Sequence, residues 1–202
     1  MIIIEKATEE LEKRVEGSGC EEGIVSLSVD PDRKTCQFDR GACMIASYGG
    51  RSAEFVTFEP TRANTRVSFM FGADLGTPPV RAAACAIINV FTGFLCMNRV
   101  LRSCSPEYHG PCLNELKDRV SGKRVAIAGS SGNLEAGLRS GLVAISENPD
   151  IIIITADGLT SGADEALIGK KGDHAEIMFI SPSTSGVAAL TDYHHWCPYG
   201  KG

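Results

Sequence analysis

From residue 123 onward the chain repeats one pattern three times: an apolar β-branched run, a small polar loop and a segment of helical character. Strands that alternate with helices predict a parallel sheet with right-handed crossovers. The near-continuous apolar runs are typical of strands that are buried on both faces. We therefore expect a small Rossmann-like parallel sheet in the C-terminal half. Its strand–loop segments are KRVAIAGSSG (123–132), DIIIITADGLTSG (150–162) and EIMFISPSTSG (176–186), and its helical segments are 133–142, 163–171 and 187–193.

The residues before this unit follow a different pattern. Four short runs of β character, separated by turn-rich pieces, favour an antiparallel meander. An amphipathic helix is expected at the N-terminus, and a long apolar helix is expected from Pro78 to about Arg102. The predicted fold class is α/β, with an α+β lobe at 1–112 and a Rossmann-like lobe at 113–202. The four β runs are 23–30, 42–49, 53–60 and 66–72.

Residues 82–98 carry no charged side chain, so a membrane helix has to be weighed against a core helix. This stretch only just reaches the length of about 17 residues that a bilayer span needs. Asn89 and Asn98 interrupt it, and we therefore favour a helix buried in the protein core. The N-terminal apolar run is too short for a secretory signal, because charged residues follow at once. A cytoplasmic protein is expected.

The charge and the cysteine content limit the partners. A net charge of −5 argues against nucleic acid, which needs a basic face, and gives no attraction to an anionic membrane. Eight cysteines without an export signal suit a reducing compartment, where thiols are free, metal-binding or catalytic. The partners that remain are a small anionic ligand or a metal ion, and a second copy of the chain if the apolar helix forms an interface.

The loops after the three predicted strands should meet at one edge of the parallel sheet, where α/β proteins bind ligands. They are rich in glycine and hydroxyl groups, and each precedes a helix whose N-terminus attracts anions. A bound phosphate, carboxylate or sulfate is one interpretation, and ordinary turn chemistry is the other. The G-x-G-x-x-G fingerprint is absent, so we expect no nicotinamide dinucleotide. The candidate ligand-binding residues are Gly129, Ser130, Ser131, Gly132, Asp157, Ser183, Thr184 and Ser185.

Two segments concentrate thiol and imidazole groups, which are ligands of zinc, iron and other soft to borderline metals. The first has the spacing C-x4-H-x2-C, and the second is the C-terminal tail. This spacing differs from the C-x2-C pair of a zinc ribbon. The alternative is that the cysteines are small core residues and the tail is an aromatic plug. The candidate metal ligands are Cys104, His109, Cys112, His194, His195 and Cys197.

The order of these motifs resembles a known family. AAACAIINVFTGF in the apolar helix is followed by GKRVAIAG, DIIIITADGLTSG and FISPSTSGVAAL. The similarity is clearest at Asn89, at the strand after Gly122 and at the Pro-Ser-Thr loop of 182–184. The chain is in this respect similar to the heavy-metal chelation family of unknown function. The resemblance implies an enolase-N-terminal-like lobe, a Rossmann-like domain and a site between the two.

Three functions agree with these observations. The first is a metal-handling protein that binds a transition metal (zinc or iron) or a metal-containing small molecule in a cleft between the lobes, for example in cofactor assembly. The second is a metal-free enzyme that acts on an anionic metabolite, phosphorylated or carboxylated, or on a nucleotide-type ligand. The third is a non-catalytic interaction module. The fold does not choose among them, because Rossmann-like units carry many chemistries, and no catalytic residue is assigned.

Overall fold

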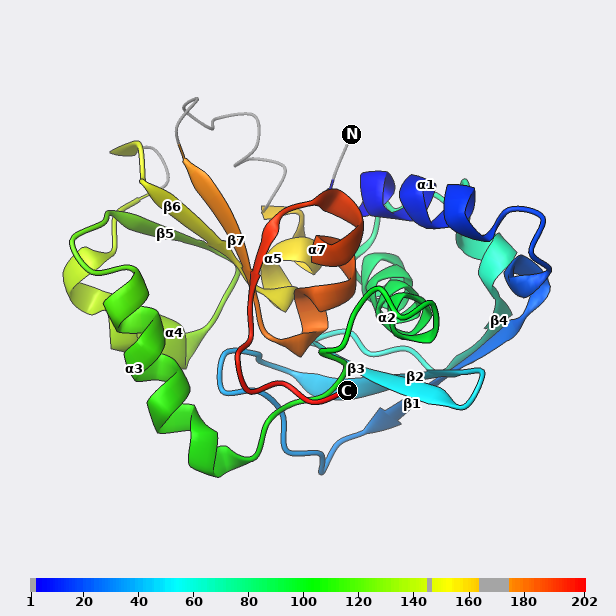
Figure 1. Ribbon diagram of the computed structural model, residues 1–202, viewed down its shortest axis with the longest axis horizontal. Helices are drawn as coiled ribbons and strands as arrows, with labels where there is room; N and C mark the ends of the chain where they lie inside the picture. The colour runs from blue at the N-terminus through cyan, green and yellow to red at the C-terminus, as the bar shows by residue number, and fades with distance from the viewer. Residues whose placement is uncertain (1–2, 145–146, 164–174) are drawn as a thin grey trace.

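The computed structural model describes residues 3–144, 147–163 and 175–202. Within these residues it contains two four-stranded sheets, one antiparallel and one parallel, with helices between and outside them (Figure 1). The α/β class that the sequence predicts is confirmed. The helix expected at 163–171 lies outside the described residues, apart from its first position.

The antiparallel sheet has the strand order β3-β2-β1-β4. The run at 66–72, predicted as a strand, is different: the strand ends at Arg66, and a 3-10 helix follows over Val67–Met70. Val67 and Met70 are both buried. Their spacing of three matches one turn of a 3-10 helix and not the alternating faces of a strand. The strands are β1 (Ile24–Asp30), β2 (Ala42–Tyr48), β3 (Arg51–Thr57) and β4 (Ala63–Arg66).

The parallel sheet confirms the three predicted strands, but a short helix, α5 (Ala156–Ser161), occupies the stretch that was predicted as the second loop. Its first three strands pair in sequence order: β5 (Val125–Ala128), β6 (Ile151–Ile154) and β7 (Glu176–Ile180). Each isoleucine of β6 is at most 2% exposed, as burial on both faces requires. A fourth parallel strand, β8 (His194–Trp196), comes from the C-terminal tail and pairs with β7. The sequence pattern did not predict β8, because three residues are too few to show an alternation.

Of the two long helices, one packs against the antiparallel sheet and the other packs on that helix (Figure 1). α1 (Ile3–Val15) buries the predicted face of Ile4, Leu11 and Val15. α2 (Pro78–Phe94) packs against α1, β2 and β3. The apolar stretch that was predicted to form a core helix is therefore buried inside the protein. In the described part of the chain, no helix combines the length and the apolar character that crossing a bilayer requires.

The predicted end of α2 near Arg102 is wrong by about two turns of helix, since the helix stops at Phe94. Beyond it, Cys96 adopts a left-handed conformation with φ 59°, and the chain reverses. Leu101 then packs so closely on Gly93 that a Cβ on this glycine would lie 2.6 Å from its side chain. The segment after α2 consequently returns along the molecule and does not extend the helix.

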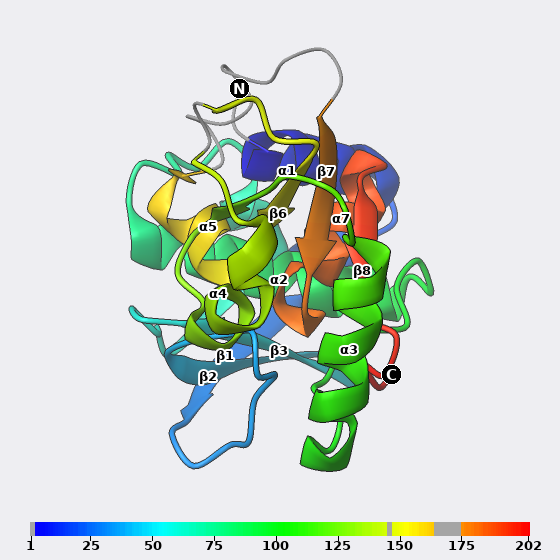
Figure 2. The same cartoon turned by 90° about the vertical axis from the view of Figure 1, so that its left-hand side faces the viewer.

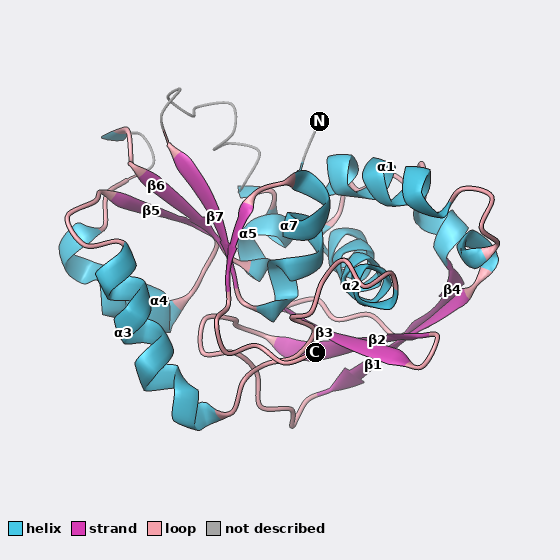
Figure 3. Ribbon diagram, in the orientation of Figure 1, coloured by secondary structure: helices cyan, strands magenta, loops and turns pink. Residues whose placement is uncertain are grey.

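Shorter helices cover both faces of the parallel sheet. α3 (His109–Arg119) and α4 (Gly132–Leu138) lie on its outer face (Figure 2). α5 (Ala156–Ser161) and α7 (Ser185–Thr191) lie on its inner face, between the two sheets. The main core joins residues from both halves of the sequence, and a second core lies under α3 and α4. Figure 3 shows that loops gather beside β3, near the C-terminus.

Candidate functional site

The C-terminal tail lies beside the segment that follows α2 (Figure 1). The Arg102 N–H donates to the Lys201 carbonyl at 2.8 Å, and the Lys201 N–H donates to the Arg102 carbonyl at 2.9 Å. The ring of Tyr199 stacks on that of Tyr108, with 5.0 Å between the ring centroids. This pairing brings together the two segments in which the sequence concentrates thiol and imidazole groups.

Four cysteines and one histidine line a single small cavity, which we call the thiol pocket. They come from the β1–β2 loop, from the segment after α2, from α3 and from the tail. The cavity has a volume of about 10 Å³, close to the space that one water-sized sphere needs. All four cysteines are free thiols. The residues of the thiol pocket are Cys36, Cys104, His109, Cys112 and Cys197, and the cavity is also lined by Gln37, Phe38, Ser181, Pro182, Trp196 and Tyr199.

Local structure holds these side chains in place. His109 begins α3, and its carbonyl accepts a hydrogen bond from Gln37 Nε2 at 2.6 Å. Cys112 follows three positions later, so both side chains lie on one side of the helix. Cys36 and Cys112 are buried, whereas Cys104 and Cys197 are partly exposed as residues. The pocket therefore combines two buried cysteines with two that are partly exposed.

Burial keeps the thiols of the pocket protonated. It raises the pKa of Cys197 to about 12 and the pKa of Cys112 to about 11, and neighbouring thiols add to both shifts. Burial also raises the pKa of Cys36 well above its usual value and raises the pKa of Cys104. At neutral pH the pocket thus holds neutral thiols. They are weak nucleophiles, because the thiolate is the reactive form.

His109 supplies a nitrogen donor to the pocket. Its Nε2 is buried and has no hydrogen-bond partner within the described residues. A buried polar atom without a partner costs about 1–3 kcal/mol, so a ligand at this nitrogen would be stabilising. No three His, Cys, Asp or Glu side chains of residues 3–144, 147–163 and 175–202 already have metal-binding geometry. Binding therefore requires the cysteine side chains to rotate toward the ion.

His194 and His195 do not line the thiol pocket. They are neighbours on β8 and point to opposite faces of the strand. His194 Nε2 lies 2.8 Å from Nη2 of Arg119. His195 Nε2 lies 2.8 Å from the Ser181 carbonyl and donates to it, because a carbonyl only accepts. Of the six predicted metal ligands, the structure brings together Cys104, His109, Cys112 and Cys197, and it adds Cys36.

A carboxylate beside the thiol pocket joins the two halves of the molecule. Asp39 accepts hydrogen bonds from the hydroxyls of Ser181 and Ser183, at 2.7 and 2.8 Å. Burial raises the pKa of Asp39 to about 7, although both hydroxyls act to lower it. Ser181 has φ 79° and ψ 163°, a conformation that glycine alone adopts easily. The surrounding contacts therefore compensate for about 1–3 kcal/mol of backbone strain at Ser181.

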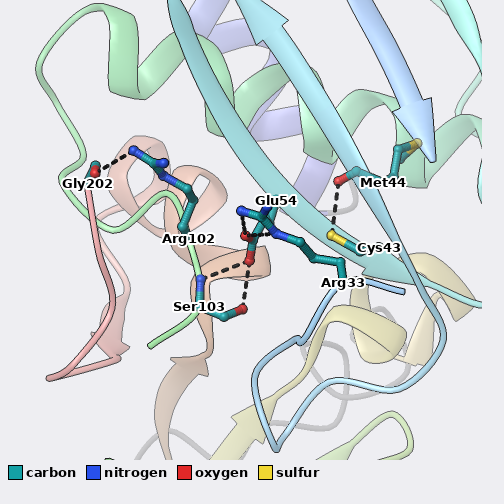
Figure 4. A network of polar contacts seen from close by, with 7 residues as sticks. All are labelled: Arg33, Cys43, Met44, Glu54, Arg102, Ser103 and Gly202. Carbon is teal, nitrogen blue, oxygen red and sulfur yellow. Dashed lines mark hydrogen bonds and ion pairs between the residues drawn. The ribbon is translucent and has the colours of Figure 1, made fainter. Parts of the chain in front are cut away.

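A second carboxylate, the buried Glu54 of β3, positions the segments that carry Cys36 and Cys104 (Figure 4). Its Oε1 accepts from Nε and Nη2 of Arg33, at 2.9 and 2.7 Å. Its Oε2 accepts from the N–H and the hydroxyl of Ser103, at 2.8 and 2.7 Å. Arg33 lies in the same loop as Cys36, and Ser103 is adjacent to Cys104. The network therefore ties two sides of the pocket to β3.

Asn89 in the middle of α2 binds the loop after β7. It is fully buried, and its Nδ2 donates to the carbonyls of Ser183, Glu54 and Pro182 at 2.9, 3.2 and 3.3 Å. Its Oδ1 accepts from the N–H of Gly186 at 2.9 Å. One amide thus binds four backbone groups, from β3, from the loop after β7 and from the first turn of α7.

The predicted ligand-binding loop after β7 is built into this internal contact. Ser183, Thr184 and Ser185 are 1%, 0% and 2% exposed. Ser183 donates to Asp39, Thr184 to the carbonyl of Ile180, and Ser185 to the carbonyl of Pro182. Their hydroxyls form hydrogen bonds inside the protein and do not face solvent.

The predicted loop after β5 is more open. Ser130 donates its N–H to Asp157 Oδ2 at 2.6 Å, and its hydroxyl accepts from Arg40 Nη1 at 3.2 Å. Gly129 has φ 89°, and a Cβ there would lie 2.1 Å from the Gly158 nitrogen, so glycine is required. Ser131 is fully buried, whereas Gly129 and Gly132 border a cavity of about 510 Å³. The cavity is also lined by Ile127, Glu135, Ala136, Arg139, Leu142 and Val143.

The fold and the pocket together define an α/β protein that has helices between its two sheets and a thiol-lined cavity where its halves meet. A search of solved structures finds a protein of unknown function of the DUF364 family from Pyrococcus horikoshii. The similarity has a TM-score of 0.52 at 13% sequence identity, and covers 90% of this chain and 80% of that chain. At this identity it shows the fold alone. No family model matches the chain, and no curated protein matches it.

Sequence reasoning did not select Cys36, Asp39 or Ser181 as site residues. Cys36 and Asp39 lie in a turn-rich piece between two strands, where no periodic pattern marks a residue. The one available signal was a thiol and a carboxylate three positions apart. The strain at Ser181 leaves no trace in the sequence, because serine is an ordinary residue for a turn.

Proposed function

We propose that this protein binds a thiophilic metal ion, such as zinc or iron, in the thiol pocket and acts as a metal-handling protein. One observation carries the proposal: four thiols from four separate segments and a partnerless His109 Nε2 meet at one cavity of about 10 Å³. Thiolate and imidazole are the ligands that these metals take in proteins. A cavity of about 10 Å³ suits a single ion better than a larger metal-bearing cofactor.

Two other roles for buried cysteines explain fewer of the features of the thiol pocket. Core packing accounts for apolar thiols, but it gives no reason for an imidazole nitrogen without a partner at the same place. A redox sensor needs exposed thiols of low pKa, whereas burial raises the pKa of all four thiols here. The sequence resemblance to the heavy-metal chelation family bears on the fold more than on the function, and the structural neighbour is of unknown function. The metal function therefore rests on the thiol pocket.

Metal analysis of the protein tests this function. Protein purified without oxygen and without a metal-affinity tag is expected to hold, or to take up at micromolar concentration, about one equivalent of zinc or iron. Cys112→Ser removes a pocket thiol and is expected to weaken binding on the order of 100-fold. Cys96→Ser is the matched control, because Cys96 is exposed at the end of α2. Less than about a tenth of an equivalent in the wild type, or equal binding by both variants, contradicts the proposal.

A second candidate function is an enzyme that binds an anionic metabolite beside the loop after β5. The observation that favours it is a cavity lined by Gly129, Gly132 and Arg139, next to the contact between Arg40 and Ser130. Two guanidinium groups can hold a phosphate or carboxylate. The test is a thermal-shift series with phosphate, nucleotides and carboxylates. A flat response, or a response that Arg40→Gln and Arg139→Gln leave unchanged, rules this function out.

A further inference from the structure

One wall of the thiol pocket is attached to the protein differently from the others. The β1–β2 loop, the segment after α2, α3 and the loop after β7 each place a residue in the protein interior. These residues are Phe38, Leu101, Leu116 and Ser181, which are at most 3% exposed. Residues 197–202, which we call the strap, are all exposed or partly exposed. Within the strap, only Tyr199 packs partly against the core under α3 and α4. The strap is therefore the least buried wall of the pocket.

Hydrogen bonds at the surface hold the strap in place. The Lys201 carbonyl accepts from the N–H groups of Leu101 and Arg102, and the Lys201 N–H donates to the Arg102 carbonyl. Four side-chain contacts at the surface add to this bridge. They join Lys201 Nζ to Ser105 Oγ, Arg102 Nη2 to the Gly202 carbonyl, the Tyr199 hydroxyl to Glu115, and the Tyr199 ring to the Tyr108 ring. A segment with few buried apolar contacts and exposed hydrogen bonds opens at a low free-energy cost.

The chain immediately before the strap is fixed. Trp196 pairs with Ile180 across β8 and β7, and its carbonyl accepts from the Ser181 N–H at 3.3 Å. The boundary between the fixed strand and the strap therefore falls between Trp196 and Cys197. Movement about this boundary would carry Cys197 and Tyr199 away from the cavity and leave the parallel sheet intact.

The size of the pocket requires such a movement. A cavity of about 10 Å³ holds about one water-sized sphere. A hydrated metal ion and an organic thiol reagent are both larger, so neither reaches the buried Cys36 and Cys112 while every wall stays in place. One wall has to move, and the strap is the wall whose contacts are least buried.

We propose that the strap closes the thiol pocket and opens locally, while both sheets stay folded, to admit solutes to the buried thiols. Opening breaks the bridge of Lys201 to Arg102 and the stack of Tyr199 on Tyr108. As a control on metal uptake, this inference rests on the proposed function, but the opening itself needs no metal. The strap sets how fast an ion enters and leaves the pocket.

Alkylation of the full chain, reduced and freed of metal, measures the opening. The protein is treated with excess iodoacetamide for increasing times and digested, and mass spectrometry gives the modified fraction of each cysteine. Cys96 is exposed and should react without any opening, whereas Cys85 is fully buried in α2 and should react only when the core unfolds. Alkylation of Cys85 should accelerate with urea below the unfolding midpoint. Alkylation of Cys112 should stay nearly constant there, because opening of the strap exposes little surface.

Two variants weaken the strap at different contacts. Gly200→Ala places a Cβ 2.4 Å from Val100 Cγ1, and it should accelerate alkylation of Cys112 on the order of tenfold. Tyr108→Ala removes the aromatic stack and should accelerate the same reaction about 2- to 10-fold. Neither variant should change the rate at Cys85, because the core stays folded.

Gly110→Ala in α3 is the matched control, because nothing lies within 4 Å of its added Cβ, and it should leave every rate unchanged. The inference is wrong if Cys112 follows Cys85 in its response to urea, or if both strap variants react at the wild-type rate. Metal uptake by the same proteins separates the two conclusions. Zinc or iron binding, with Cys112 following Cys85, supports the proposed function and overturns the inference. Selective opening in a protein that binds neither metal supports the inference and overturns the proposed function.

Discussion

Replacing Asn89 by alanine should destabilise the contact between the two halves more than any surface substitution. The side chain satisfies four backbone groups, among them the buried Gly186 N–H and the Ser183 carbonyl. Leaving these two without their partner costs about 1–3 kcal/mol each. The space left by the amide adds roughly 1 kcal/mol. The free energy of unfolding should therefore fall by about 3–7 kcal/mol.

Urea denaturation measures this loss. With a slope of about 2 kcal/mol per molar urea, the midpoint should fall by roughly 1.5–3.5 M. Fluorescence of Trp196, the single tryptophan, reports on the parallel sheet, and far-ultraviolet circular dichroism reports on both halves. The two transitions should coincide if the shared core unfolds as one unit.

The matched control is Asn64→Ala. Asn64 is exposed on the edge strand β4, and its replacement should change the free energy of unfolding by no more than about 0.5 kcal/mol. A loss below about 1 kcal/mol for Asn89→Ala, with the protein still folded, would refute the reasoning, because the four hydrogen bonds would then contribute almost nothing. An equal loss in both variants would refute it as well.

Three further predictions concern the same contact. Burial raises the pKa of Asp39 in the folded state to about 7, so between about pH 4 and 7 the folded state binds a proton that the unfolded state has lost. The stability of the wild type should therefore fall relative to that of Asp39→Asn as the pH rises from about 4 to 7. Paired urea titrations measure this difference, and a difference that stays constant with pH would contradict the prediction. Ser181→Gly should be more stable than Ser181→Ala by about 1–3 kcal/mol, since both lose the hydroxyl and only glycine relieves the strain; equal thermal midpoints would argue against strain. Gly186→Ala places a Cβ 2.5 Å from Asn89 Oδ1 and should cost about 2 kcal/mol or more by calorimetry, whereas Gly110→Ala in open space should cost nothing.

Local patterns in the sequence were enough for most of the secondary structure. The isoleucines of 151–154 predicted a buried strand, and the face of Ile4, Leu11 and Val15 predicted an amphipathic helix. Both signals depend on neighbours a few positions away. The same kind of reasoning failed at 66–72, because a spacing of three at Val67 and Met70 was hidden within a run of β-forming residues.

The thiol pocket could be predicted only in part from such local patterns. The spacing of Cys104, His109 and Cys112 marked one side of it, and the tail containing Cys197 marked another. Nothing local indicated that Cys36, in a loop between distant strands, completes the set. Nor did composition separate His195 from the metal ligands, since only the pairing of β8 with β7 shows which way that side chain points.

The sequence alone thus determined an α/β chain with a parallel sheet at its C-terminal half, because hydrophobic periodicity and turn residues act over short distances along the chain. The tertiary structure alone decided which cysteines meet, which predicted loop is internal and where the strained serine lies. These depend on contacts between segments separated by many tens of residues, such as the bridge of Arg102 to Lys201 and the bonds of Ser181 and Ser183 to Asp39. Such contacts follow from how the antiparallel sheet and the helices α5 and α7 pack on α2, which no local pattern contains.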